Sequence, residues 1–174
     1  AALRRCLELE EHELGLRLAS ATWRMWQATG RYAEGRSWLS RLLEGSGPSA
    51  AVRADALMAL AGLAYWQADY PAAWTAYEEA LELYRSGGDR TNEAEVLNAL
   101  SMTATWRGDA VKGAELAIEA RALFEALGTR AKVGEALMAQ GFALWQEHRY
   151  DDARPFWEDA LAISRELGDD TLAV

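Results

Sequence analysis

Residue types that commonly carry out catalysis or bind metal ions are scarce in this sequence. His12 and His148 are the only imidazoles, and neither has a cysteine or carboxylate at metal-ligand spacing on one face of its predicted helix. Cys6 has no second cysteine to pair with, and the adjacent carboxylates of Glu78 and Glu79 point in different directions on a helix, which is poor geometry for general acid-base catalysis. We therefore predict no catalytic residue, no metal site and no cofactor, in a protein that is not an enzyme.

The charge balance of the chain is acidic. There are 18 Lys and Arg residues against 27 Asp and Glu residues, a formal net charge of -9. This charge would repel a phosphate backbone, which argues against direct nucleic-acid binding. The longest nearly uncharged apolar stretch, Ala54 to Trp66, is too short for a membrane span, which needs about 20 residues. The lone cysteine fits a reducing cytoplasm, which is the predicted location.

Any interaction surface must be positioned by helices, because strong helix formers dominate the chain and strand signals are nearly absent. Equivalent residues recur every 40 positions, as at Gly88, Gly128 and Gly168. Each period holds two amphipathic helical patterns, which in the first period cover about 53–68 and 71–85. The sequence therefore predicts repeated pairs of helices.

The predicted helices meet at tight corners and at close crossings. Asp69 and Asp109 stand where a helix N-cap is expected, and a glycine follows the second helix of each period. Small residues recur at positions where a larger side chain would force the two helices of a pair apart. These positions are Ala61, Ser101, Gly141, Ala73, Gly113 and Ala153.

The pattern resembles the tetratricopeptide repeat (TPR) family, in which small and aromatic residues recur at fixed spacing. The resemblance implies an all-α fold, a right-handed α-α superhelix of stacked helix-turn-helix (TPR-like) repeats. The period of 40 residues is longer than the usual value of about 34, and the proline that ends the family's unit is missing. The residues that carry the resemblance are Leu57, Leu60, Ala61, Ala64, Tyr70, Ala73, Tyr77 and Ala80, followed two units later by Leu137, Gly141, Leu144, Tyr150, Ala153, Trp157 and Ala160.

We expect one TPR-like array over residues 1–174. A solenoid normally ends in a polar capping helix, so uncapped ends predict further repeats in a longer protein or a surface for self-association. The expected parts are a leading helix at 1–13, a degenerate repeat at 14–45, repeats at 53–90, 93–130 and 133–170, and the start of a truncated further repeat at 171–174.

A narrower resemblance concerns the first part of the chain. The stretch from Glu13 to Ala19, with Trp23, Trp26, Gly30 and the stretch from Glu34 to Leu39, is similar to the TPR sensor arrays of large bacterial transcription regulators of the LuxR/AfsR (STAND) type. This resemblance implies the signal-sensing or partner-docking segment of a larger cytoplasmic regulator.

The TPR resemblance also implies a binding site, because the first helices of successive units line a concave groove in such arrays. The implied strip is rich in aromatic residues and methionine and has an acidic border, which suits a protein or peptide with apolar anchors and basic flanks. Two other functions remain open: a self-associating structural scaffold, and a small-ligand sensor that uses the same groove. The implied partner-binding positions are Asp55, Met58, Tyr65, Trp66, Glu95, Asn98, Met102, Trp106, Glu135, Met138, Phe142 and Trp145.

The eight tryptophans are not all expected to serve this groove. Core or inter-repeat packing is predicted for Trp23, Trp38, Trp74 and Trp157. For Trp66, Trp106 and Trp145, exposure in the groove and burial in the core both remain open.

Overall fold

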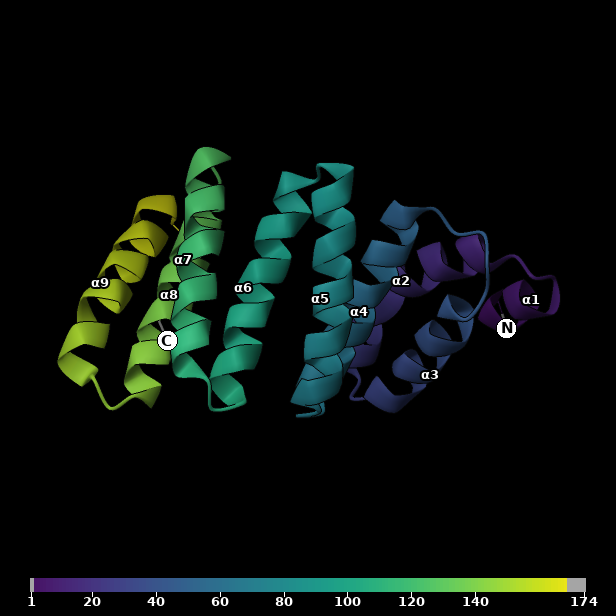
Figure 1. Ribbon diagram of the computed structural model, residues 1–174, viewed down its shortest axis with the longest axis horizontal. Coiled ribbons are helices and arrows are strands. Elements are labelled where there is room, and N and C mark those ends of the chain that lie inside the picture. The colour runs from purple at the N-terminus through teal and green to yellow at the C-terminus, as the bar shows by residue number, and fades with distance from the viewer. Residues whose placement is uncertain (1, 169–174) are drawn as a thin grey trace. The chain divides into compact units, whose positions relative to one another are not determined.

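The computed structural model describes residues 2–168, within which the chain forms nine α-helices and no strand (Figure 1). The predicted all-α class is confirmed. The helices fall into two compact units, Ala1–Gly88 and Asp89–Val174.

The first unit holds five helices, and the first four of them contribute to an apolar core. Buried Leu16, Trp26, Leu39 and Leu63 bring α2, α3 and α4 together in this core. The leading helix is shorter than the predicted 1–13, because Glu10 takes a left-handed backbone conformation (φ 56°) before the next helix begins. The helices are α1 (Ala2–Glu8), α2 (His12–Ala28), α3 (Tyr32–Leu43), α4 (Ala50–Trp66) and α5 (Tyr70–Gly87).

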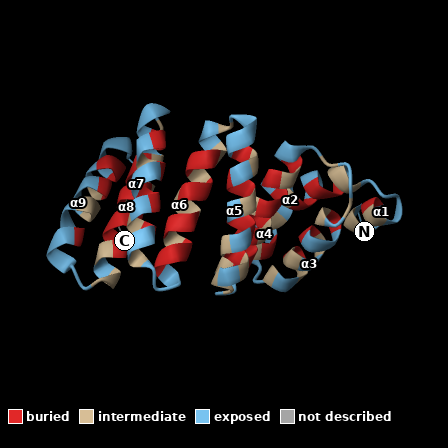
Figure 2. Ribbon diagram, viewed as in Figure 1, coloured by how far each residue is buried: buried red, intermediate tan, exposed pale blue. Residues whose placement is uncertain are grey.

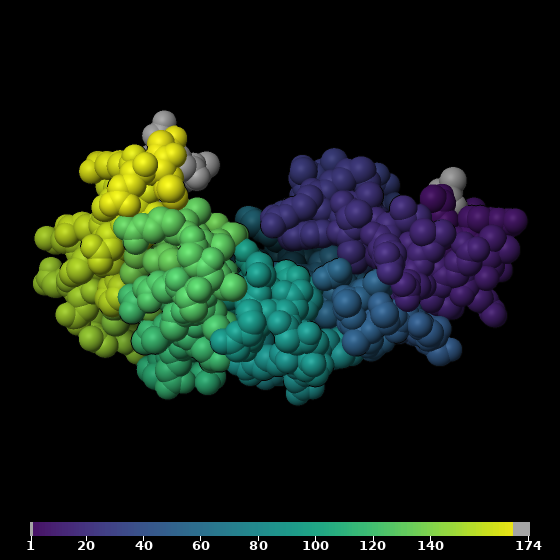
Figure 3. Space-filling model, turned by 90° about the horizontal axis from the view of Figure 1, so that it is seen from above, coloured from purple at the N-terminus to yellow at the C-terminus, as the bar shows by residue number. Residues whose placement is uncertain are grey.

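The second unit holds two helix pairs, α6 (Arg90–Trp106) with α7 (Ala110–Ala126), and α8 (Arg130–Gln146) with α9 (Tyr150–Leu167). Helix α8 packs against both α6 and α7, so the two first helices of the pairs lie side by side. Buried residues run along α6 from Glu93 to Thr105, whereas α9 is mostly exposed or intermediate (Figure 2). In the space-filling view, the green-to-yellow part of this unit is closely packed on the face shown (Figure 3).

The small residues predicted at the helix crossings are buried in the structure. A Cβ atom added to Gly113 would clash with Thr105 Oγ1 and lie 2.9 Å from the backbone oxygen of Ser101. A Cβ atom at Gly141 would clash with the indole of Trp157. Close approach of the paired helices therefore depends on these positions, as the sequence predicted.

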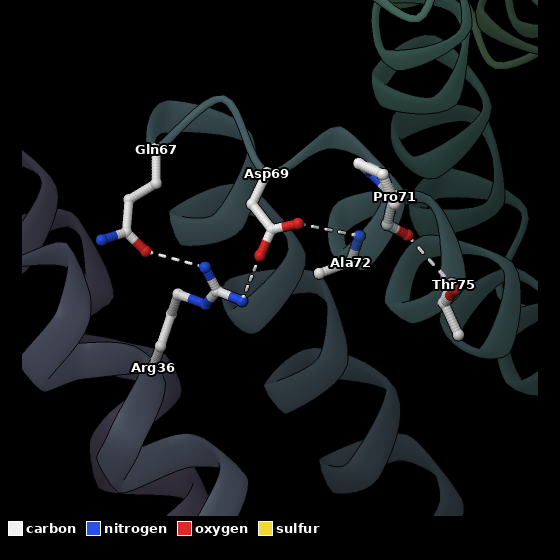
Figure 4. Close-up of polar contacts among 6 residues, drawn as sticks. All are labelled: Arg36, Gln67, Asp69, Pro71, Ala72 and Thr75. Carbon is white, nitrogen blue, oxygen red and sulfur yellow. Dashed lines mark hydrogen bonds and ion pairs between the residues drawn. The ribbon is translucent and has the colours of Figure 1, made fainter.

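The corner between α4 and α5 is held by a short polar network (Figure 4). Asp69 Oδ1 accepts a hydrogen bond from the backbone N–H of Ala72 at 3.3 Å, which caps α5 as predicted. Arg36 reaches over from α3 and donates to Asp69 Oδ2 and to Gln67 Oε1, each at 2.8 Å. The hydrogen bond from Arg36 holds the pKa of the Asp69 carboxyl below its ordinary value.

Two further aspartates cap the N-terminal ends of helices, and a glycine ends another helix. Asp109 accepts from the backbone N–H of Lys112, which confirms the predicted cap of α7, and Asp89 caps α6. Gly88 ends α5 in the left-handed conformation, with φ 71°. Glycine suits this position because a residue with a side chain would be strained there.

Candidate functional site

The predicted partner-binding residues are divided between the two units. Four of them, Asp55, Met58, Tyr65 and Trp66, lie on α4 of the first unit. Trp66 is 54% exposed, and its ring meets that of Tyr65 edge-on at 6.0 Å between centroids. Asp55 is engaged within the protein, because its Oδ1 accepts a 2.7 Å hydrogen bond from the hydroxyl of Tyr84 on α5.

The other eight predicted residues lie on α6 and α8 of the second unit, where three aromatic rings form a row. The Trp106 and Phe142 centroids are 5.1 Å apart with the rings tilted by 47°, and Phe142 stacks on Trp145 at 5.7 Å and 18°. Trp106 is 45% exposed and Trp145 is 43% exposed. This aromatic row (Trp106, Phe142 and Trp145) therefore joins the two first helices and presents large apolar surface to solvent.

An apolar pocket of about 320 Å³ continues from the aromatic row, with Phe142 belonging to both. Four predicted site residues from α6 and α8 line the pocket. Trp157 of α9 also lines it, although the sequence predicted only a packing role for this residue. Trp157 fills both roles, because its indole also lies over Gly141. The lining residues are Met102, Glu135, Met138, Ala139, Phe142 and Trp157.

The acidic border of the second unit, formed by Glu95 and Glu135, contains a lysine that the sequence analysis missed. Lys132 Nζ lies 3.0 Å from Glu95 Oε1 on α6 and 3.0 Å from Glu135 Oε2 on its own helix. Desolvation lowers the pKa of Lys132, but the two carboxylates outweigh it and leave this pKa above its ordinary value. Lys132 precedes Glu135 by three residues, a helical ion-pair spacing that was visible in the sequence.

Asn98 follows Glu95 by one turn on α6 and is half-buried. Its Oδ1 is buried and finds no hydrogen-bond partner among the described residues. A buried acceptor without a donor costs free energy, so this oxygen lowers the stability of the face rather than adding to it.

The two histidines lie apart from this region. His148 Nδ1 is 2.8 Å from the hydroxyl of Tyr150 at an exposed corner. The ring of His12 packs so closely on Gly45 that a Cβ atom added there would overlap it. Within residues 2–168 there is no cluster of three or more His, Cys, Asp or Glu side chains suited to a metal ion. Over the same range, no helix combines the length and apolar character that a bilayer span requires.

Self-association was predicted at the two ends of the array. At the first end, Leu9 and Leu14 are each 48% exposed, and Leu3, Leu18 and Met25 line a pocket of about 300 Å³. The predicted second end, 171–174, lies outside the described residues.

No protein-family model matches the chain. No curated protein matches it either. Solved structures do resemble it. BtubC (BKLC) from P. vanneervenii has a TM-score of 0.76 at 20% identity, over 95% of this chain and 72% of that one. RapI in its apo form has a TM-score of 0.79 at 13% identity, over 91% of this chain and 57% of that one.

A third similar structure is itself made of TPR-like repeats. It is a kinesin light chain from Podospora anserina with nearly identical TPR-like repeats, which has a TM-score of 0.68 at 12% identity over 95% of this chain and 93% of that one. At such identities the likeness bears on architecture alone. The chain therefore folds as an all-helical array of TPR-like helix pairs.

Proposed function

We propose that this chain is a non-catalytic scaffold that binds a segment of a partner protein along the α6 and α8 face of its second unit. The observation that carries the proposal is the aromatic row, which stays exposed on the surface and continues into the apolar pocket. Exposed tryptophans beside a pocket are typical anchors of protein interfaces, where a few aromatic contacts dominate the binding energy.

The chemistry of this face favours a partner segment with apolar anchors and basic flanks. Met102 and Met138 are adaptable side chains that can repack around an aliphatic or aromatic anchor. The net charge of -9 attracts cationic segments over a distance. Glu95 and Glu135 add less to this attraction than two free carboxylates would, because Lys132 already forms ion pairs with both.

A second candidate function is small-ligand sensing in the same place. The apolar pocket, at about 320 Å³, is at the lower end of the volumes that hold small molecules, roughly 300–1,000 Å³. A thermal-shift screen of metabolites separates the two functions, because only a ligand-sensing pocket gives stabilisation by a small molecule alone.

The proposal also includes a cellular setting. The sequence resemblance to sensor arrays supports a partner-docking or signal-sensing segment of a larger cytoplasmic bacterial transcription regulator. The full reading frame tests this setting, because a nucleotide-binding module upstream or a DNA-binding domain at one end is expected.

Binding to defined peptides tests the docking proposal directly. We would select dodecapeptides from a phage-displayed library on the 174-residue chain and measure the synthetic winners by calorimetry. The double variant Trp106→Ala, Met138→Ala should lose at least about tenfold in affinity, as expected for interface anchors. The control variant Ile118→Ala, Leu127→Ala removes exposed apolar groups from α7 and its end and should bind normally. Equal affinities of the two variants would exclude this face.

A further inference from the structure

A second pocket of the same unit lies where α6 and α8 end. It has a volume of about 280 Å³, and its lining includes Trp106, Asp109, Val111, Gln146 and Glu147. We call it the corner pocket. Trp106 belongs both to this pocket and to the aromatic row, so the corner pocket extends the proposed docking surface at one end.

The corner pocket is electrostatically suited to a cation. Helix α6 ends at Trp106 and α8 ends at Gln146, and the C-terminal end of a helix carries partial negative charge. Glu147 adds a full carboxylate whose side chain is 30% exposed. Asp109 adds another, although its Oδ1 already accepts the backbone N–H of Lys112.

The carboxylate of Glu147 forms a long ion pair with Arg149. Arg149 NH1 approaches Glu147 Oε2 only to 3.5 Å, the outer limit of a hydrogen bond. Arg149 pairs more closely with Asp152, at 2.8 Å. Lys112, the lysine next to the pocket, has its Nζ 3.2 Å from Glu115.

We propose that the corner pocket is a subsite for an arginine side chain of the docked partner. A guanidinium group is planar, so it can lie against the indole of Trp106 while its N–H groups donate to the Glu147 carboxylate. A lysine ammonium has no flat surface to stack on the indole and no pair of parallel N–H groups to bind both carboxylate oxygens. The subsite rests on the proposed docking function for its role, but its chemistry is separate from that of the apolar anchors.

The subsite also gives the docked segment a direction. At the opposite end of the α6 and α8 face, Lys132 supplies a built-in cation to Glu95 and Glu135. A cation from the partner would have to compete with Lys132 there at 3.0 Å from each carboxylate, whereas at the corner pocket it meets a carboxylate whose ion pair with Arg149 is longer, at 3.5 Å. The basic flank of the partner therefore lies at the corner pocket, beyond Trp106.

The test uses a pair of small probes and the full chain. Nα-acetyl-arginine methylamide is titrated into isotope-labelled protein, with Nα-acetyl-citrulline methylamide as the neutral isostere. The indole N–H signal of Trp106, identified by its loss in Trp106→Phe, is expected to shift saturably with arginine and at least about fivefold more weakly with citrulline. Glu147→Gln should reduce the arginine affinity by a similar factor, about fivefold.

The control variant is Glu158→Gln, which removes one negative charge from an exposed position on α9. It should bind the arginine probe as the unmodified protein does, and thermal melting checks that both variants are folded. Equal binding of arginine and citrulline, or equal loss in the two glutamine variants, would overturn the subsite. Shifts centred on Trp145 would overturn it as well.

The outcomes for the subsite and for the docking function can be told apart. Met102→Ala, Met138→Ala removes apolar anchors and leaves the corner pocket intact, so it should abolish peptide binding without changing arginine binding. If no peptide binds but arginine still shifts Trp106, the subsite stands and the docking function fails. If peptides bind through the aromatic row but arginine leaves Trp106 unshifted, the subsite alone fails.

Discussion

The indole ring of Trp106 on α6 lies 5.1 Å from the phenyl ring of Phe142 on α8, measured between ring centroids. This contact links the first helices of two successive pairs. It is therefore both part of the candidate binding face and a tertiary contact within the second unit.

The two rings should contribute differently to stability. Phe142→Ala empties a half-buried site and should lower the free energy of unfolding by about 2–3 kcal/mol, whereas Trp106→Ala should cost less than about 1 kcal/mol because the indole is 45% exposed. A double-mutant cycle by urea unfolding should give a coupling of about 0.5 kcal/mol, the lower end of the range for aromatic pairs. Additive effects would show that the ring contact contributes nothing to the fold.

Substitution of two glycines should have opposite effects on stability. Gly113→Ala places a methyl group against Thr105 Oγ1 and 2.9 Å from the Ser101 backbone oxygen, so it should destabilise the protein by about 1–3 kcal/mol. Gly87→Ala, on α5 with no atom within 4 Å of the new methyl group, should be neutral or stabilising by about 0.5 kcal/mol. Thermal unfolding of both variants checks this, and a stable Gly113→Ala variant would contradict the close crossing of α6 and α7.

Removal of Lys132 should increase the affinity of the face for cationic segments. Lys132→Met keeps most of the apolar stem but frees Glu95 and Glu135, whose carboxylates Lys132 contacts at 3.0 Å. The probe is a synthetic heptapeptide with a Leu-Trp-Leu centre and two lysines at each end, compared with the same peptide carrying glutamines. Affinity for the lysine peptide should rise by about threefold to tenfold, since partly exposed ion pairs are worth up to about 1 kcal/mol.

The glutamine peptide is the control for this measurement. Its affinity should not change on Lys132→Met, because it has no charge to gain from the freed carboxylates. An equal gain for both peptides would indicate a change in packing rather than in charge.

The Asp69 carboxylate should make stability depend on pH in the acid range. Its pKa is lowered from the ordinary 3.8, first by the hydrogen bond from Arg36. A group whose pKa is lower in the folded state stabilises the fold above its unfolded pKa, and this stabilisation is lost as pH falls through the folded pKa. Asp69→Asn keeps an N-cap side chain and removes the charge, so the stability difference from the unmodified protein should be constant above about pH 4 and should close below it.

Urea unfolding of the two proteins at several pH values measures this difference. The size of the effect is limited, because the Asp69 side chain is 40% exposed and solvent screens the pair. In the background Arg36→Met, the difference should shrink at pH values above about 4, where the Asp69 carboxylate is charged. A difference that widens as pH falls would contradict the assigned shift.

Much of the architecture followed from local patterns in the sequence. Asp69 and Asp109 were predicted as caps because a cap bonds an N–H only three residues away. Gly113 and Gly141 were predicted at crossings because two helices joined by a short turn must pack on their nearest faces. Such features depend on one turn or one helix pair, and residue type at fixed spacing is enough to reveal them.

Contacts between segments that are distant in the sequence decide which residues make up the candidate site. Lys132 and Glu95 are 37 residues apart, and their ion pair exists only because α8 packs beside α6 in one register. Trp157 also depends on tertiary packing. Helical periodicity predicted only a packing role for it, but its indole crosses over Gly141 and reaches the apolar pocket. Periodicity predicts which side of a helix is apolar, but side-chain reach and the register between helices decide which residues meet at a surface.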